Sequence, residues 1–319
     1  MIPPSHAPAF LDRAGWDGAE ILPLAGDASF RRYFRVHRGA DSAVLMDAPP
    51  EHEDSRPFLA VAEHLGAIGF RAPRVLAKDL DGGLILLEDF GDARMKEVIE
   101  ADPAAEMPIY AQAIDLLADL HGHAAGPLPP YDMAVYQREA ALFPEWYLPA
   151  VGLDADAASY AAAWDEALAP IRADRSVSVL RDYHAENIML LGDGSLGLLD
   201  FQDALAGHPA YDLVSLLQDA RRDVPPAIEA AMIARYAERR PFDEAAYALL
   251  GAQRNAKILG IFTRLWKRDG KPRYLAFQPR VWGYLERDLA HAALAPVKAW
   301  FDAHVPAEKR SDHWTDHSA

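Results

Sequence analysis

The sequence predicts an α+β protein with a small N-terminal part built on an antiparallel sheet and a larger, mainly helical C-terminal part. Three observations predict this class. Two runs with β-branched and aromatic residues, 33–36 and 43–48, flank a break at Gly39-Ala40-Asp41, which is typical of a β-hairpin. An apolar run at 84–87 reads as a buried strand that ends in a polar break. From residue 109 onward, apolar residues recur three and four positions apart, which is helical spacing.

Length and composition narrow the class of protein. The chain has 319 residues, 51% of them hydrophobic, which is enough to bury a large core. Its formal charge is 32 − 48 = −16, which argues against a nucleic-acid-binding surface. The absence of cysteine excludes disulfides, thiolate metal sites and thiol catalysis. No run reaches the roughly 18 apolar residues of a membrane-spanning helix, and the start lacks signal-peptide features, so we expect a soluble cytoplasmic protein without an obligate protein partner.

The helical pattern continues through the chain. A short amphipathic helix is expected from Pro57 to Gly69, with Glu63 on its surface. Longer helices are expected over 109–120, over 247–267 and, as the last element, over Val281 to Phe301. The aromatic residues of 143–147 lie on a further helical segment.

The central motif is the stretch from Asp182 to Asp200. Asp182 and Asn187 are five residues apart on a predicted loop, and the apolar runs 188–191 and 196–199 predict a hairpin around Gly192-Asp193-Gly194. This hairpin would return Asp200 to the side of the loop. Phosphoryl transfer needs a carboxylate to orient the attacking hydroxyl and oxygen ligands to hold Mg²⁺ on the phosphates. Asp182, Asn187 and Asp200 fit these three tasks.

These residues carry a resemblance. Asp182, His184, Asn187 and Asp200 match the signature of the aminoglycoside phosphotransferase family. The sequence therefore resembles a protein-kinase-like, two-lobe fold, and it does so from about residue 20 to about residue 300. This resemblance implies a nucleotide-binding lobe at 1–90 and a catalytic and substrate lobe at 91–304. The polar, histidine-containing tail at 305–319 is expected to be flexible.

The resemblance also implies roles for individual residues. Asp182 would be the catalytic base, and Asn187 and Asp200 would be the Mg²⁺ ligands. His184 and Asp212 would brace the catalytic loop, although Asp212 could equally cap the helix that follows it. ATP would be bound by a turn over its phosphates and by the backbone of a hinge beside its adenine. The turn comprises Ser29, Phe30, Arg31 and Arg32, and the hinge comprises Leu87, Glu88, Asp89 and Phe90.

The sequence departs from the kinase pattern at Met46. Kinases place a phosphate-anchoring lysine on this strand, and Glu63 would be its helix partner. Without that lysine, Glu63 is expected to be a solvated charge, and Arg31, Arg32 or Arg35 would have to supply the missing cation. The substitution also leaves open a catalytically inactive, kinase-like binding module.

The acceptor is indicated by three further segments, 26–36, 45–50 and 253–260, which are similar to bacterial amino-sugar kinases of this family. They imply phosphorylation of the anomeric hydroxyl of N-acetylmuramate and N-acetylglucosamine, in peptidoglycan recycling. A kinase of the aminoglycoside or choline type is the alternative. Trp146 is either a core residue or a sugar-stacking one. Arg254, Lys257 and Arg264 form a stripe that is either a solvated face or a receiver for a substrate carboxylate.

Overall fold

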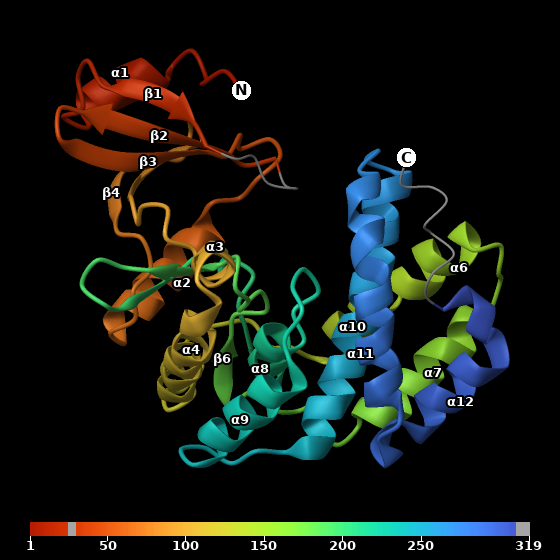
Figure 1. The fold of residues 1–319 in the computed structure, drawn as a ribbon. Helices are drawn as coiled ribbons and strands as arrows, with labels where there is room; N and C mark the ends of the chain where they lie inside the picture. Colours follow the sequence, from red (N-terminus) through yellow and green to blue (C-terminus); the bar gives the residue numbers. More distant parts are fainter. Residues whose placement is uncertain (25–29, 311–319) are drawn as a thin grey trace. The chain divides into compact units, whose positions relative to one another are not determined.

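The computed structural model describes residues 1–24 and 30–310. The chain forms two compact units (Figure 1). The first contains Met1–Ala101 and Glu186–Asp203, and the second contains Asp102–Ala185 and the described part of Ala204–Ala319. The chain therefore leaves the second unit after Ala185 and returns to it at Ala204. The expected division into a nucleotide-binding lobe at 1–90 and a catalytic and substrate lobe at 91–304 stays a prediction.

An antiparallel sheet forms the first unit, with five strands among the described residues in the order β1-β2-β3-β5-β4. Their bounds are β1 Glu20–Pro23, β2 Arg32–Arg38, β3 Asp41–Asp47, β4 Val75–Asp79 and β5 Leu84–Glu88. Arg38 pairs with Asp41, which leaves a two-residue loop that begins at Gly39. Gly39 has a φ of 61°, as tight hairpin turns require, and the predicted hairpin is confirmed.

The sheet buries one face against the N-terminal helix. Helix α1, Ala7–Arg13, packs Phe10 against a cluster that includes Phe34, Leu45 and Leu86. Met46 also lies in the core, with no exposed surface. Helix α2, Arg56–Ala67, carries Glu63 on its exposed side, in agreement with a solvated charge.

The predicted hairpin after the central loop is present in the first unit. Strand β7, Ile188–Leu190, pairs with β8, Leu196–Leu198. Both strands are tied to the rest of the unit through the backbone, because Leu190 N donates to Ala93 O at 2.7 Å and Leu198 N donates to Arg71 O at 2.8 Å. Helix α3, Met95–Ala101, lies next to β7. These contacts fix the hairpin within the first unit.

Helices dominate the second unit. They are α4 Glu106–Leu120, α5 Met133–Ala140, α6 Leu148–Ala150, α7 Ala157–Leu168, α8 Ala210–Leu217, α9 Pro226–Ala237, α10 Glu244–Lys267, α11 Gln278–Leu289 and α12 Ala295–His304. The long α10 contacts α5, α8, α11 and the π-helical turn η2, Phe143–Tyr147. At Gly260, a Cβ atom would lie 2.3 Å from the Leu142 carbonyl, so only glycine permits this close approach of α10.

A two-stranded sheet precedes and follows the loop 180–185 in the second unit. Strand β6, Val177–Val179, pairs with β9, Leu205–Gly207, in antiparallel register. The first strand leads into the loop 180–185, and the second leads into α8. The loop and the start of α8 therefore emerge from the same small sheet.

The C-terminal end differs from the prediction. A single helix from Val281 to Phe301 was expected, but α11 ends at Leu289 and α12 begins at Ala295. Pro296 lies in the first turn of α12 and cannot continue a helix from the preceding residues, because it has no N–H. The His291 side chain accepts a hydrogen bond from Ala293 N at 3.2 Å and starts the short 3-10 turn η4, Ala292–Leu294, between the two helices.

The expected flexible tail, 305–319, begins with folded residues. Val305 is buried, 307–309 form a 3-10 turn, and the Arg310 guanidinium donates to Phe301 O at 2.8 Å. Residues 311–319 lie outside the described part of the chain. Among the described helices, none combines the length and the apolar character needed to span a bilayer.

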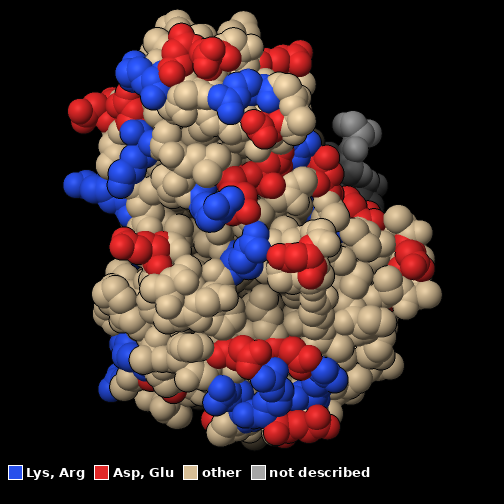
Figure 2. Space-filling model, turned by 90° about the vertical axis from the view of Figure 1, so that its left-hand side faces the viewer, with Lys and Arg blue, Asp and Glu red and all other residues tan. Residues whose placement is uncertain are grey.

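Acidic and basic side chains are interleaved on the face shown in Figure 2. Ion pairs between such side chains also join helices. Helices α9 and α4 are joined by Arg235 with Asp115, at 2.6 Å, and by Arg239 with Asp119. Because these side chains are partly exposed to water, which screens their charges, each pair stabilises the fold only weakly.

Candidate active site

Asp182 lies on a loop whose backbone is held by α8. The preceding residue, Arg181, has a φ of 72°, which is unfavourable for a residue with a side chain. The Asp212 carboxylate accepts hydrogen bonds from Leu180 N at 2.6 Å and from Arg181 N at 2.9 Å. Asp212 is thus positioned to hold the strained conformation, and it lies in the first turn of α8 without acting as its N-cap.

A second line of contacts reaches the same loop from α10. Ser215 Oγ donates to Arg181 O at 3.1 Å, and Arg254 Nη2 donates to Ser215 Oγ at 3.0 Å. Arg254 is only 3% exposed. Its guanidinium is therefore used within the protein, as part of the support for the loop 180–185.

Glu139 on α5 is the common partner of two cations near the loop. Its carboxylate forms ion pairs with Arg181 and, at 3.1 Å, with Lys257 Nζ, and it also accepts a hydrogen bond from Tyr131 Oη. Burial alone would raise the pKa of Glu139, but Lys257 and Arg181 outweigh it and lower the pKa to about 2. Glu139 is therefore ionised over the whole physiological range.

Asp182 is half-buried and surrounded by positive charge. Burial acts to raise its pKa, but the charges of Lys257, Arg254 and Arg181 outweigh burial, and the pKa is lowered from its ordinary value. The carboxylate is consequently ionised at neutral pH. An ionised carboxylate at this position can accept a proton from a hydroxyl group.

His184 lies beside Asp182 within the same loop. Its backbone N–H donates to Asp182 O at 3.0 Å, and its ring Nε2 lies 3.3 Å from Arg221 Nη1. Burial is the main cause that lowers the pKa of His184, so the ring is neutral and can accept a hydrogen bond from the guanidinium. This geometry suits the predicted bracing role, which stays a prediction.

The predicted metal ligands lie together in the first unit, at the open end of the β7–β8 hairpin. Leu199 N donates to Asn187 O at 2.9 Å, which fixes the two strand ends. Asn187 Nδ2 lies 3.4 Å from Asp200 Oδ2, and Gln202 Nε2 donates to Asp200 Oδ1 at 2.8 Å. Asp200 has a φ of 57°, another conformation that is unfavourable for a residue with a side chain.

This donor set fits Mg²⁺. The ion prefers oxygen ligands and is usually held by one or two carboxylates together with phosphate oxygens and water. Asn187 and Asp200 offer an amide oxygen and a carboxylate from adjacent strand ends. Among the described residues there is no group of three or more histidine, cysteine or acidic side chains that could hold a metal ion.

The arginines expected to contact ATP phosphates each have a carboxylate partner in the first unit. Arg31 lies 3.2 Å from Glu53, Arg32 forms an ion pair with Asp47, and Arg35 lies 2.8 Å from Asp89. Phe30 is 64% exposed and stacks on His52, with ring centroids 4.7 Å apart. Ser29, the first residue predicted for this turn, lies outside the described residues.

The predicted hinge follows strand β5. Leu87 pairs with Val44, and the Glu88 side chain forms ion pairs with Arg71 and Arg74, both at 3.0 Å. Asp89 accepts from Gly91 N at 2.9 Å. The Phe90 ring packs against the backbone at Gly197, where an added Cβ atom would lie 2.6 Å from the ring.

Only part of the predicted basic stripe on α10, Arg254, Lys257 and Arg264, is available to bind a substrate carboxylate. Arg254 and Lys257 are paired with protein groups, as described above, whereas Arg264 is half-buried, and its Nε has no hydrogen-bond partner among the described residues. Burial and the neighbouring Arg268 lower the pKa of Arg264. Trp146, on η2, is also half-buried, so its position excludes neither a packing nor a stacking role.

The sequence alone missed Glu139, Ser215 and Arg221. Ser215 carried a signal, because it is a polar residue within the apolar run Leu213-Val214-Ser215-Leu216-Leu217. Glu139 and Arg221 carried none, since their partners are distant in sequence.

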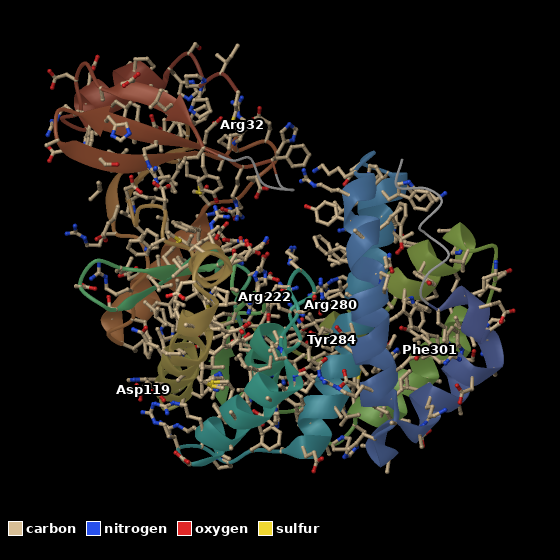
Figure 3. The ribbon with its side chains drawn as sticks, viewed as in Figure 1. Arg32, Asp119, Arg222, Arg280, Tyr284 and Phe301 are labelled. Atoms are coloured by element: carbon tan, nitrogen blue, oxygen red, sulfur yellow. The ribbon has the colours of Figure 1, made fainter. Side chains whose placement is uncertain are left out.

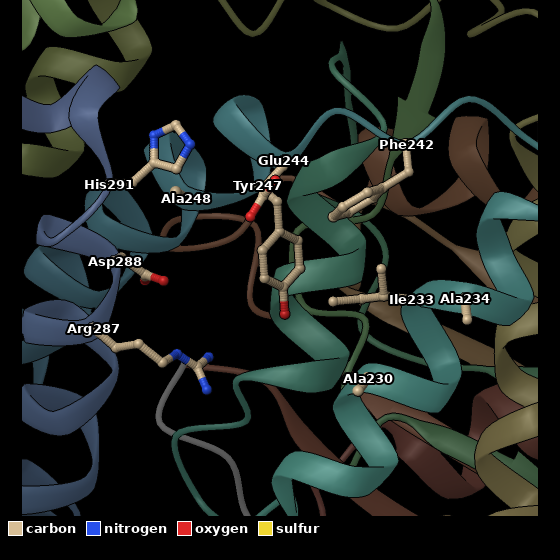
Figure 4. A pocket seen from close by; sticks show the side chains of 10 residues that line it. All are labelled: Ala230, Ile233, Ala234, Phe242, Glu244, Tyr247, Ala248, Arg287, Asp288 and His291. Atoms are coloured by element: carbon tan, nitrogen blue, oxygen red, sulfur yellow. The ribbon is translucent and has the colours of Figure 1, made fainter.

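A separate pocket of about 610 Å³ lies between α9, α10 and α11 (Figure 4). Its walls combine apolar side chains such as Ile233 and Phe242 with Arg287, Asp288 and His291. None of the site residues predicted from the sequence lines it.

Comparison with known proteins shows the family of this chain. The profile of the phosphotransferase enzyme family matches residues 20–250. An N-acetylmuramate/N-acetylglucosamine kinase from Caulobacter vibrioides is 42% identical, over 95% of this chain and 96% of its own length. A kinase of the same name from Pseudomonas aeruginosa is 40% identical, over 90% of this chain and 89% of its own length.

Solved structures share the fold at low identity. The choline kinase LicA from Streptococcus pneumoniae superimposes with a TM-score of 0.65 at 14% identity, covering 91% of this chain and 99% of its own. A spectinomycin phosphotransferase solved with ADP and spectinomycin gives a TM-score of 0.66 at 12% identity, covering 93% and 98% of the two chains. The fold is therefore kinase-like, and the chain belongs to the phosphotransferase enzyme family.

Proposed function

We propose that this protein is an ATP- and Mg²⁺-dependent kinase that phosphorylates the anomeric hydroxyl of N-acetylmuramate and N-acetylglucosamine. The observation that carries the reaction is the ionised Asp182 carboxylate on a loop braced by Asp212 and Ser215. The acceptors are supported by the names of the relatives at 42% and 40% identity.

Asp182 would orient the sugar hydroxyl and accept its proton late in the reaction. A bond forms between the anomeric oxygen and the γ-phosphorus as the bond between that phosphorus and the bridging oxygen of ADP breaks. The anomeric hydroxyl is the most acidic hydroxyl of a sugar, so a carboxylate of low pKa is sufficient as the acceptor. Asn187 and Asp200 would hold Mg²⁺, which neutralises charge on the phosphate oxygens when bound.

ATP would be bound by the N-terminal lobe. The adenine edge would meet the backbone of 87–90, and the phosphates would lie under the turn at 29–32. Because the strand lysine is replaced by Met46, Arg31 or Arg32 would supply the cation, at the cost of weakening its pair with Glu53 or Asp47. The products would be the sugar 1-phosphates, formed in the cytoplasm during peptidoglycan recycling.

An ATP-consumption assay tests the proposal. N-acetylmuramate and N-acetylglucosamine should support turnover in the presence of Mg²⁺, whereas their methyl glycosides should not, because the anomeric oxygen is blocked. Activity only on choline or an aminoglycoside would overturn the sugar assignment. No activity on any acceptor, with ATP still bound, would indicate an inactive binding module.

A further inference from the structure

Helix α10 is enclosed by its neighbours in the second unit. Helices α5, α8 and α11, the turn η2 and the 3-10 turn η3, Pro272–Phe277, all contact it. Helix α11, which carries Arg280 and Tyr284, runs beside α10 (Figure 3). The Arg280 guanidinium is already used, because it forms an ion pair with Asp223 and donates to Ala220 O at 3.1 Å. These neighbours leave little of α10 in contact with water.

The accessible part of α10 is a single row of side chains. Between residues 246 and 265, all side chains are buried except those of Lys257, Ile261 and Arg264, which are half-buried. Spacings of four and three place these residues above one another on one face of the helix. An apolar side chain thus lies between two cations. The ends of the row are separated by seven residues of helical rise, or about 10 Å, which suits a monosaccharide with a charged substituent.

The Lys257 end of the row lies near the proposed base. Lys257 Nζ is 3.1 Å from Glu139 Oε1 and 3.2 Å from Tyr211 Oη. Glu139 also pairs with Arg181, the residue directly before Asp182. Of the charges that lower the pKa of Asp182, that of Lys257 acts most strongly. Lys257 is therefore close to the base, but its own charge is balanced by Glu139.

The other end of the row carries a cation without a counter-charge in contact. Among the described residues, Arg264 forms no ion pair, and its buried Nε has no hydrogen-bond partner. Asp269 is held by Arg268 at 2.6 Å, and Glu145 is exposed. Burial and the charge of Arg268 outweigh these two carboxylates and lower the pKa of Arg264. A carboxylate bound at Arg264 would offset both effects.

We infer that Arg264 receives the lactyl carboxylate of N-acetylmuramate, while the sugar ring lies over Ile261. This inference rests on the proposed function and names the residue that distinguishes its two acceptors. Ligand sites commonly combine apolar surface with a few placed polar groups, as this row does. The lactyl group is attached two ring carbons from the anomeric carbon, so its carboxylate lies well away from the hydroxyl at Asp182.

The charged contact would be made by only one of the two sugars. N-acetylglucosamine lacks the lactyl group and would leave Arg264 in water. A guanidinium pairs with a carboxylate through two parallel hydrogen bonds, which would also fix the orientation of N-acetylmuramate. Arg264 would therefore determine the preference between the acceptors without taking part in phosphoryl transfer.

The first test is the ratio of kcat/KM for the two sugars, measured on the same preparation of each variant so that partial unfolding cancels. Arg264→Ala should lower the value for N-acetylmuramate by roughly 10- to 100-fold relative to N-acetylglucosamine. Arg264→Lys should restore part of this loss, because it keeps the charge but not the paired hydrogen bonds.

The second test changes the sugar instead of the protein. In an analogue of N-acetylmuramate, the lactyl carboxylate is replaced by a carboxamide, which removes the charge at nearly the same size. The parent protein should prefer the acid to the amide by a similar factor. This preference should disappear in Arg264→Ala. A variant that still distinguishes the acid from the amide as the parent does would place the receiver elsewhere.

Two further variants serve as controls. Arg235→Ala removes a positive charge from an exposed ion pair between α9 and α4 and should leave the ratio unchanged. Arg273→Ala tests a rival receiver, an exposed arginine on η3 whose guanidinium lies 5.2 Å from the Tyr274 ring centroid. An unchanged ratio in Arg264→Ala, an equal loss on both sugars, or a selective loss in Arg273→Ala alone would overturn the inference. A parent protein inactive on both sugars would overturn the proposed function as well.

Discussion

The two halves of the central motif are supported in different ways. Asp182, in the second unit, is surrounded by side chains from α5, α8 and α10, including the buried pair of Glu139 and Lys257. Asn187 and Asp200, in the first unit, are held by the backbone ladder of a short hairpin and by Gln202. Charges already present in the fold thus surround the proposed base, whereas strand geometry positions the proposed metal ligands. Mutations near Asp182 and mutations at Asp200 should therefore have different effects on activity and stability.

The largest effect is expected at the base. Asp182→Asn removes the proton acceptor but keeps the size of the side chain, so kcat should fall by roughly 10²- to 10⁴-fold. ATP affinity should stay close to that of the parent protein, because Asp182 is not a nucleotide ligand in this account. Near-normal turnover would exclude the proposed role.

The charge network around the base is tested by Glu139→Gln. This change leaves Arg181 and Lys257 without their counter-charge, and breaking a buried pair in this way costs about 3–5 kcal/mol. We expect a lower Tm for the variant at pH 7, measured by calorimetry. Glu63→Gln, on the exposed side of α2, is the control and should unfold like the parent protein.

The same pair predicts a pH dependence of stability. The pKa of Glu139 is lowered to about 2 in the folded state, so its contribution is present above its ordinary pKa of 4.5 and is lost as the pH falls toward 2. The stability difference between the parent protein and Glu139→Gln should therefore shrink as the pH falls through this acidic range. A stability difference that does not change with pH would contradict the ion-pair explanation.

The proposed role of Asp200 as a Mg²⁺ ligand is tested by Asp200→Ala. Because one oxygen ligand is removed, the Mg²⁺ concentration needed for half-maximal activity should rise at least tenfold, roughly the minimum effect of disturbing metal-ligand support. Asp203→Ala, three residues further along and exposed, is the control. If the Mg²⁺ titration of Asp200→Ala overlaid that of the parent protein, Asp200 would not be a ligand.

The smallest effects are expected on the nucleotide side. Arg31→Ala and Arg32→Ala should each raise the KM for ATP by about a few-fold, since each arginine already has a carboxylate partner and is not fully available. Normal kinetic constants in both variants would mean that another group replaces the lysine absent at Met46.

Local patterns predicted much of the fold. The hairpins at 32–47 and 188–198 follow from apolar runs separated by glycine-containing turns. Helical spacing predicted a helix over 247–267, and α10 begins three residues earlier, at Glu244. The last helix was predicted incorrectly, because the apolar spacing continues across Pro296 although the backbone cannot.

Less of the candidate site than of the fold could be predicted from the sequence. Asp182, Asn187 and Asp200 could be identified because the motif is local. The stripe of Arg254, Lys257 and Arg264 could not be interpreted from spacing alone, since the partners of the first two, Ser215 and Glu139, are distant in sequence. Arg221 was missed for the same reason.

Phosphorus NMR of the reaction products is the most direct test of the proposed anomeric transfer. Each sugar would be incubated with ATP and Mg²⁺, with the anomeric hydroxyl free or methylated. We expect a signal coupled to the anomeric proton for both free sugars and no product from either methyl glycoside. A 6-phosphate product, or unchanged activity on the methyl glycosides, would contradict the account.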